Sequence, residues 1–254
     1  MRAVVFDIYD TLVLAEKRHF APSRSLVPLL GESLVQDLIR AGARIPESVG
    51  ELADAIAERV TRHHRRARLT GAPDLIQPEV DARQVWREVL RARRMPLALA
   101  ARAHAQWESA RFHFRAAPGA SSALRALCDR GLALGILSNA QHDTPARFQQ
   151  CYGITPQAAG FRPDLTLWSW KLGCAKPDPG VFTALTRALA SHSISPSQTL
   201  FVGNDPLSDI APAAAAGFCT AHYAGSPQSP APDKTGARPD FVFTHFSQLI
   251  EITA

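Results

Sequence analysis

The chain has 254 residues, 46% of them apolar and 20% charged, and its formal net charge is +5. This composition fits a globular protein with a full hydrophobic core, and no apolar run is long enough to cross a membrane. The four cysteines lie too far apart for a C-x-x-C metal or redox motif. We therefore expect a cytoplasmic protein without a membrane partner, as a monomer or homodimer. The modest positive charge suits a small anionic substrate, and no motif indicates a nucleic acid partner.

Short apolar runs predict the strands of a parallel sheet. They cover residues 3–6, 132–137, 165–168, 199–202, 218–223 and 241–244. Helical patterns of roughly ten to fifteen residues separate most of these runs, and that alternation is typical of βαβ units. We therefore predict an α/β fold in which residues 1–14 and 116–254 form a Rossmann-like parallel sheet with helices on both faces.

Residues 15–115 hold no comparable series of strand runs. Helical periodicity covers most of this segment, at residues 33–43, 49–68, 81–93 and 97–115. The segment is expected to form a second, all-helical lobe, or cap, over the end of the first strand. Near the other end of the chain, residues 225–239 are rich in Pro, Ser and Gly and are expected to form a surface loop.

Polar residues follow several of the predicted strands. Asp7 ends the first run, Ser138 follows the second, and Asp205 follows the run at 199–202. Because ligands of open α/β sheets bind beyond the carboxyl ends of the strands, these residues are expected to form one site. Lys176 precedes Asp178-Pro179, a pattern typical of a helix N-terminus, which favours anions. Carboxylates beside a lysine suit a hard cation next to a phosphoryl group.

Four segments, in their order and spacing, resemble the four motifs of the haloacid dehalogenase (HAD) superfamily. Along the chain they read FDIYDTLV, ILSNA, KPDPGVF and FVGNDPLSDIAPAAAAGF. They lie toward both ends of the chain and leave the middle as a helical cap of the kind that this family inserts after its first motif. The resemblance implies a hydrolase with its active site between the core and the cap.

The resemblance also implies a role for each matching residue. Asp7 would attack the substrate and form an aspartyl ester or aspartyl phosphate that water then hydrolyses. Thr11 and Ser138 would hold the transferred group through their hydroxyls, and Asn139 would contact the substrate. Lys176 would neutralise the nucleophile and the charge that develops during the reaction.

Phosphatases of this family hold Mg²⁺ through the first Asp, the backbone carbonyl two residues later, and an acid of the fourth motif. In this chain those positions are Asp7, the carbonyl of Tyr9, and Asp209 or Asp205. Asn204 stands where many of these phosphatases have the first acid of the fourth motif, and it is expected to contact the substrate. The resemblance therefore implies that the site binds Mg²⁺.

Tyr9 departs from the phosphatase pattern. Family phosphatases usually have a second Asp at this position, which protonates the leaving group and then activates water. A phenol with an ordinary pKa of about 10 is a poor base near neutral pH. Family members with Tyr here include the haloacid dehalogenases, whose halide leaves without a proton. Asp10, which replaces a residue that is usually Gly, is expected either to stabilise the turn or to supply the missing acid.

Two other features of the sequence favour the phosphatase. The dehalogenases typically have Tyr six residues after the lysine of the third motif, where this chain has Phe182, and the fourth motif lacks their Ser and Asn pattern. The favoured interpretation is a Mg²⁺-dependent phosphatase that acts on a small phosphate ester through an aspartyl phosphate on Asp7. The alternatives are a metal-independent 2-haloacid dehalogenase, or a related binding or regulatory protein that has lost turnover because of Tyr9.

Overall fold

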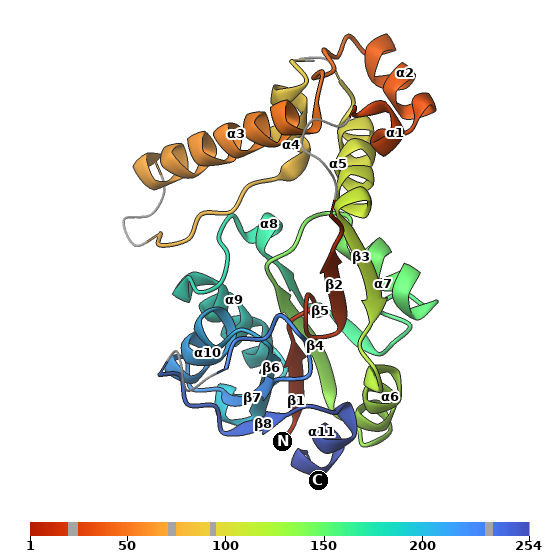
Figure 1. Ribbon diagram of the computed structural model, residues 1–254. Helices are drawn as coiled ribbons and strands as arrows, with labels where there is room; N and C mark the ends of the chain where they lie inside the picture. Colours follow the sequence, from red (N-terminus) through yellow and green to blue (C-terminus); the bar gives the residue numbers. More distant parts are fainter. Residues whose placement is uncertain (20–24, 71–74, 92–94, 232–235, 254) are drawn as a thin grey trace.

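Parallel strands form one central sheet of the protein (Figure 1). The computed structural model describes residues 1–19, 25–70, 75–91, 95–231 and 236–253. The strands are ordered β5-β4-β1-β6-β7-β8, with the bounds β1 (Ala3–Phe6), β4 (Ala133–Ser138), β5 (Phe161–Trp168), β6 (Thr199–Gly203), β7 (Cys219–Tyr223) and β8 (Phe241–Phe243). The predicted α/β, Rossmann-like fold is confirmed, although β5 begins earlier than its apolar run suggests.

Helices cover both faces of this sheet, which is surrounded by α6 (Ala120–Asp129), α7 (Thr144–Tyr152), α8 (Ser169–Leu172), α9 (Pro179–Ala190), η1 (Pro196–Gln198), η2 (Pro206–Ile210), α10 (Ala211–Ala215) and α11 (Phe246–Ile252). Successive side chains of a strand point to opposite faces. Accordingly, Val4 and Phe6 of β1 are buried with residues of α6, α7 and α11. Ala3 and Val5 are buried with residues of α9 and α10. The central strand is therefore fixed from both sides, and so is the position of Asp7 at its end.

A second group of helices lies above the carboxyl ends of the strands, as Figure 1 shows. These cap helices are α1 (Val27–Leu30), α2 (Glu32–Arg40), α3 (Val49–Thr70), α4 (Ala82–Val89) and α5 (Leu97–Arg111). They pack around a buried cluster of their own, in which the rings of Trp86 and Trp107 meet edge to face with centroids 6.3 Å apart. The last residues of the helix predicted over 81–93 lie outside the described part of the chain. No described helix is both long and apolar enough to span a membrane.

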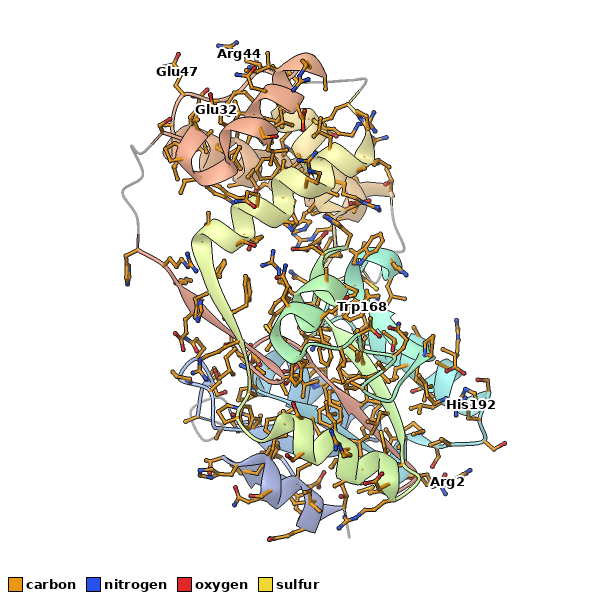
Figure 2. All side chains as sticks on the ribbon, turned by 90° about the vertical axis from the view of Figure 1, so that its right-hand side faces the viewer. Arg2, Glu32, Arg44, Glu47, Trp168 and His192 are labelled. Atoms are coloured by element: carbon orange, nitrogen blue, oxygen red, sulfur yellow. The ribbon has the colours of Figure 1, made fainter. Side chains whose placement is uncertain are left out.

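Figure 2 shows the two lobes with their side chains. Trp168, at the carboxyl end of β5, lies near the junction of the lobes, whereas Glu32 and Arg2 lie toward their opposite ends. This junction is where the polar residues that follow the strands meet the cap helices. The loop over residues 225–239 joins β7 to β8 as predicted and contains no helix or strand in its described residues.

An antiparallel ribbon of β2 (Val13–Lys17) and β3 (Phe112–Ala116) connects the sheet to the cap helices. The prediction of a helix over residues 97–115 is wrong in its last part, because α5 ends at Arg111 and Phe112 is extended, with φ −128° and ψ 147°. Aromatic residues favour strands, and Phe112 and Phe114 alternate with polar neighbours. The partner strand β2 lies far away in the sequence, so the pairing is a tertiary effect that a local helical pattern does not reveal.

Candidate active site

Two carboxylates and one ammonium group form the centre of the site. Asp7 directly follows β1, and its backbone N–H donates to the carbonyl oxygen of Val202, 2.9 Å away, which holds it against β6. Lys176 Nζ lies 2.6 Å from Asp7 Oδ1 and 2.5 Å from Asp209 Oδ1. All three side chains are buried. The structure therefore brings together the first, third and fourth motifs around a single cation.

The charges of this triad perturb one another. Burial by itself would lower the pKa of Lys176, but the charges of Asp209 and Asp7 outweigh burial and hold that pKa above its ordinary value. Burial raises the pKa of Asp209 to about 6, although the Lys176 ammonium opposes this shift. Lys176 thus stays charged, and the ion pairs depend on the ionised form of Asp209.

The loop that carries Lys176 is fixed by Asn139. The side-chain Nδ2 of Asn139 donates to the backbone oxygen of Lys176 at 2.9 Å, and the backbone N–H of Lys176 donates to Asn139 Oδ1 at 2.7 Å. The Lys176–Pro177 peptide bond is cis. Asp178 then caps α9 by accepting from the backbone N–H of Gly180 at 2.8 Å. The predicted substrate contact Asn139 therefore uses its amide to position Lys176, while it also lines the cavity described below.

Two hydroxyl groups belong to the same site. Thr11 Oγ1 donates to Asp7 Oδ2 at 3.5 Å, and Thr11 is fully buried. Ser138, at the end of β4, is also buried, and its Oγ has no hydrogen-bond partner in the described part of the chain. Buried hydroxyls are usually paired, so an orphaned one at a strand end needs an explanation. The hydroxyl of Ser138 therefore has a hydrogen-bond donor that no described residue accepts.

The contacts of Tyr9 do not suit a role in acid–base catalysis. Its hydroxyl is 3.0 Å from Thr144 Oγ1, and its ring packs on Phe114 with centroids 6.0 Å apart. Burial, followed by the charge of Asp143, raises the pKa of Tyr9 well above its ordinary value. The phenol therefore stays neutral at every pH at which the protein would work, and it cannot replace the carboxyl group that this position carries in family phosphatases.

Asp10 both shapes the turn and faces the cavity. Its φ of 57° lies in the left-handed region, which Asp tolerates better than most residues. Its Oδ1 accepts from the backbone N–H of Ala15 at 3.2 Å and from Ser226 Oγ at 3.3 Å. Burial raises the pKa of Asp10, and these two hydrogen bonds oppose the shift. The expected turn contacts are thus present, and the carboxyl group also lines the cavity.

The fourth motif divides its polar groups between the site and the local backbone. Asp205 Oδ1 accepts from the backbone N–H groups of Leu207 and Ser208 at 2.8 and 3.1 Å, so its side chain caps η2. Its own N–H donates to Asp209 Oδ2 at 3.0 Å and thereby orients Asp209. A Cβ atom at Gly203 would collide with the Asp209 carboxyl group, so only glycine fits there. Asn204 is nearly buried, and its backbone oxygen accepts from His222.

The expected magnesium ligands do not fit a cation site as they are arranged. Asp7 and Asp209 each give Oδ1 to Lys176, the second oxygen of Asp209 accepts from a backbone N–H, and Asp205 caps η2. Mg²⁺ demands near-octahedral oxygen coordination. From the expected set, this leaves the carbonyl of Tyr9 and Asp7 Oδ2, which itself accepts a long hydrogen bond from Thr11 Oγ1. Among the described residues, no group of three or more His, Cys, Asp or Glu side chains is arranged to hold a metal ion.

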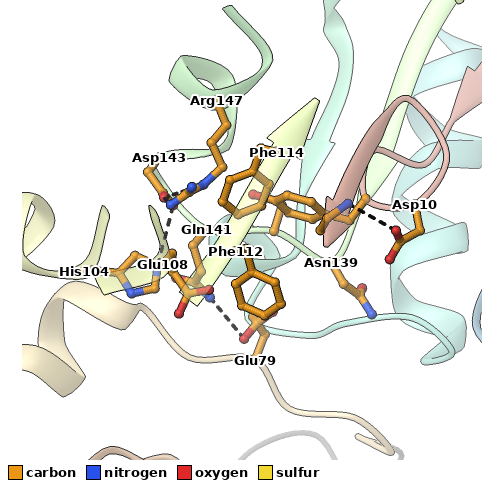
Figure 3. A pocket seen from close by; sticks show the side chains of 13 residues that line it. Asp10, Glu79, His104, Glu108, Phe112, Phe114, Asn139, Gln141, Asp143 and Arg147 are labelled. Atoms are coloured by element: carbon orange, nitrogen blue, oxygen red, sulfur yellow. Dashed lines mark hydrogen bonds and ion pairs between the residues drawn. The ribbon is translucent and has the colours of Figure 1, made fainter. Parts of the chain in front are cut away.

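A cavity of about 430 Å³ opens beside the triad, between the sheet and the cap helices (Figure 3). Tyr9 and Asp10 follow Asp7 in the chain and Asn139 follows Ser138, so the cavity adjoins residues of the first and second motifs. Its lining is Tyr9, Asp10, Ala15, Glu79, His104, Glu108, Phe112, Phe114, Asn139, Ala140, Gln141, Asp143 and Arg147. Sequence reasoning missed the contributions of the cap helices and of β3, because only the tertiary structure brings them to the strand ends.

The segment that leads into α4 places Glu79 over the site. The backbone N–H of Glu79 donates to the oxygen of Gly173 at 3.0 Å, and that of Ala175 donates to the oxygen of Gln77 at 2.9 Å. On its other side, Glu79 Oε2 accepts from Ser169 Oγ at 2.6 Å. These contacts join the cap segment to the loop that carries Lys176.

The sequence matches the model of the haloacid dehalogenase-like hydrolases over residues 1–217. Because this match covers most of the chain, the protein belongs to that family of hydrolases. A comparison with curated protein sequences gives no match.

Solved structures with the same fold include enzymes of two activities. A 2-haloacid dehalogenase from Pseudomonas syringae is 23% identical, with a TM-score of 0.61 over 99% of this chain and 97% of its own. An L-2-haloacid dehalogenase is 22% identical, with a TM-score of 0.57 over 100% and 98%. A HAD phosphatase from Thermococcus onnurineus is 16% identical, with a TM-score of 0.59 over 99% and 97%. At these identities the likeness supports the fold, and it does not choose between the activities.

Proposed function

We propose that the protein hydrolyses its substrate through an ester of Asp7 and that the leaving group is a halide on a saturated carbon. The observation that carries this proposal is the state of Tyr9. Its phenol is buried, its hydroxyl lies 3.0 Å from Thr144 Oγ1 and its pKa is raised, so the position two residues after the nucleophile supplies only a very weak acid. A halide departs without a proton, whereas an alkoxide leaving group needs one. The sequence pattern favours the phosphatase, but the contacts of Tyr9 favour this alternative.

The residues around Asp7 can carry both halves of such a reaction. Asp7 Oδ2 attacks the carbon, the carbon–halogen bond breaks, and the halide leaves with the electron pair. Lys176 pairs with Asp7 Oδ1 and would stabilise the negative charge that forms when water attacks the carbonyl carbon of the ester. The ester then breaks to release an alcohol and regenerate the carboxylate. Asp10, which lines the cavity, is the group that we assign to take one proton of that water and to return it to the alkoxide oxygen as the ester breaks. The alcohol then leaves neutral, and the Asp7 carboxyl group releases the second proton of the water to solvent.

A phosphatase is the second candidate, and one observation favours it. Asp10 lies next to the position of the missing acid, and burial raises its pKa, which favours the protonated form that a general acid needs. In that case Asp10 would protonate the alkoxide of a phosphate ester. This candidate also needs a cation or another positive group for the phosphate, because Lys176 is already shared by two carboxylates.

Oxygen labelling during turnover separates the two candidates. The purified protein is given 2-bromo-3-phenylpropanamide or 4-nitrophenyl phosphate in H₂¹⁸O, each with Mg²⁺ or with EDTA. We expect bromide release in EDTA and ¹⁸O in the peptide that contains Asp7, because water attacks the ester at the Asp7 carboxyl carbon. Phosphate release that needs Mg²⁺, with the label in phosphate and none in Asp7, would refute the proposal. Asp7→Asn is the matched inactive control for both substrates.

A further inference from the structure

An aromatic wall forms one side of the cavity beside Asp7. Phe112 and Phe114 alternate along β3 and so point to the same face, and their ring centroids are 5.8 Å apart. Tyr9 extends the wall, with its ring 6.0 Å from that of Phe114. Figure 3 shows both phenylalanine rings in the middle of the lining, between Asp10 and the pair His104 and Glu108. Such a wall offers flat apolar contact area to a substrate.

The one permanent cation among the described lining residues is occupied. Arg147 donates from Nε to Asp143 Oδ2 at 2.9 Å and from Nη2 to the same carboxylate and to the oxygen of Ala105 at 3.3 Å. Its guanidinium also lies 4.1 Å from the ring centre of Phe114. Only 4% of the Arg147 side chain is exposed. Arg147 therefore links α7 to α5 and supports the aromatic wall, and it is not an anchor for a substrate anion.

The remaining charges of the lining are negative. Glu79 accepts from Ser169 Oγ and Gln141 Nε2, which are neutral donors. Asp10 likewise accepts from an N–H and a hydroxyl. Glu108 pairs with Arg111 at 3.1 Å, so the unbalanced negative charge of the lining comes from Glu79 and Asp10. Asp143 and Arg147 form an ion pair, so their charges cancel. The charges that remain make the cavity acidic, although the whole chain carries a net charge of +5.

We propose that the part of the substrate that enters this cavity is flat, apolar and without a negative charge. Phe112 and Phe114 are the residues that select this part of the substrate. Glu79 and Asp10 disfavour anionic bodies of the same shape. This differs from the small anionic substrate that the overall charge suggests. The inference rests on the proposed function in one respect, which is that the cavity holds the substrate of Asp7. It does not depend on which bond of that substrate is cleaved.

Three probes of one size and different charge test the inference. Benzylammonium, benzyl alcohol and benzoate are titrated into the wild-type protein at pH 7.5, and dissociation constants are measured by calorimetry. We expect the first two to bind at least about tenfold more tightly than benzoate, since one unscreened carboxylate is enough for that difference. Phe114→Leu should weaken both by about fivefold or more. Phe112→Leu gives the same measurement on the other ring if the first variant fails to fold.

Variants that remove one negative charge test whether the carboxylates of the cavity disfavour anionic ligands. Glu79→Gln should narrow the gap between benzoate and benzyl alcohol, whereas Glu58→Gln on α3, whose side chain is 61% exposed, should leave all three constants unchanged. Benzoate binding as tightly as benzyl alcohol, no effect of either Phe variant, or no binding of any probe at millimolar concentration would overturn the inference. These are binding measurements, so a failure to release halide would refute the proposed function and leave this result standing.

Discussion

Replacing Lys176 with methionine should destabilise the protein by about 3 to 5 kcal/mol at pH 7, the usual cost of leaving a buried charge unpaired. The distances from Nζ to Asp7 Oδ1 and Asp209 Oδ1 are 2.6 and 2.5 Å, so these oxygens lie no more than about 5 Å apart. Two carboxylates at about 5 Å repel by about 3 kcal/mol at an effective dielectric constant of about 20. Methionine fills the space of the lysine stem and removes the charge that cancels this repulsion.

The loss should shrink at lower pH, and the sign follows from Asp209. Burial already raises its pKa to about 6, and removing the ammonium would raise that pKa further. The folded variant then holds a proton that the unfolded chain, with an ordinary Asp pKa of about 4, has released. A raised carboxyl pKa makes stability fall as pH rises through the range between the two values. Lys176→Met should therefore be closer to wild type at pH 5 than at pH 7.

Urea unfolding followed by circular dichroism at pH 5 and pH 7 measures both effects. Lys171→Met, at an exposed lysine of α8, is the matched control and should change the free energy of unfolding by less than about 0.5 kcal/mol. The double variant Lys176→Met with Asp209→Asn removes one of the two facing charges and should regain most of the loss. An equal loss at both pH values, or a double variant no more stable than the single one, would refute the electrostatic reasoning.

Three further predictions concern the same site. Ser138→Ala should lower turnover by about ten- to a hundredfold without lowering the free energy of unfolding, because its buried hydroxyl has no partner in the described chain; unchanged turnover would argue against substrate contact. Gly203→Ala should cost about 1 to 3 kcal/mol in urea unfolding, since the new Cβ collides with the Asp209 carboxyl group; a neutral effect would show that the loop yields. Turnover should fall as pH drops through about 6, where Asp209 takes up a proton and weakens its pairing with Lys176; a flat pH–rate profile from 5 to 8 would contradict that dependence.

The strands, and the positions of Asp7, Ser138 and Lys176 beside their ends, were accessible from the sequence because each depends on a local pattern, whereas the resemblance left Asp209 and Asp205 as alternatives. An apolar run that stops at Asp7 or Ser138 marks both a strand and its carboxyl end, and the parallel topology then places these ends together. Lys176 followed the same logic through its helix start. The pattern does not reveal that Ser138 Oγ lacks a hydrogen-bond partner in the described residues, or that Lys176 is shared between Asp7 and Asp209, because both depend on side-chain packing.

The aromatic wall and Glu79 escaped prediction for a tertiary reason. Phe112 and Phe114 continue the helical periodicity of α5, and only pairing with β2 converts them into a strand. Glu79 belongs to a segment without regular structure, and its contacts with Gly173 and Ser169 lie far away in the sequence. Residues that line a cavity between two lobes cannot be assigned until the packing of those lobes is known.

The sequence around Asp205 already contains a helix-cap pattern, but the resemblance favoured Asp205 as a possible metal ligand instead. Asp205-Pro206 repeats the pattern of Asp178-Pro179, and both aspartates cap the helix that begins at the next proline. Reading Asp205 as a cap leaves Asp209 as the one acid that the fourth motif gives to the triad. Lys176 then balances only one of two carboxylates, so the triad carries a net negative charge. A phosphate monoester would bring further negative charge to this site, whereas a halogenated carbon brings none, and this charge balance independently favours the carbon–halogen bond as the one that Asp7 attacks.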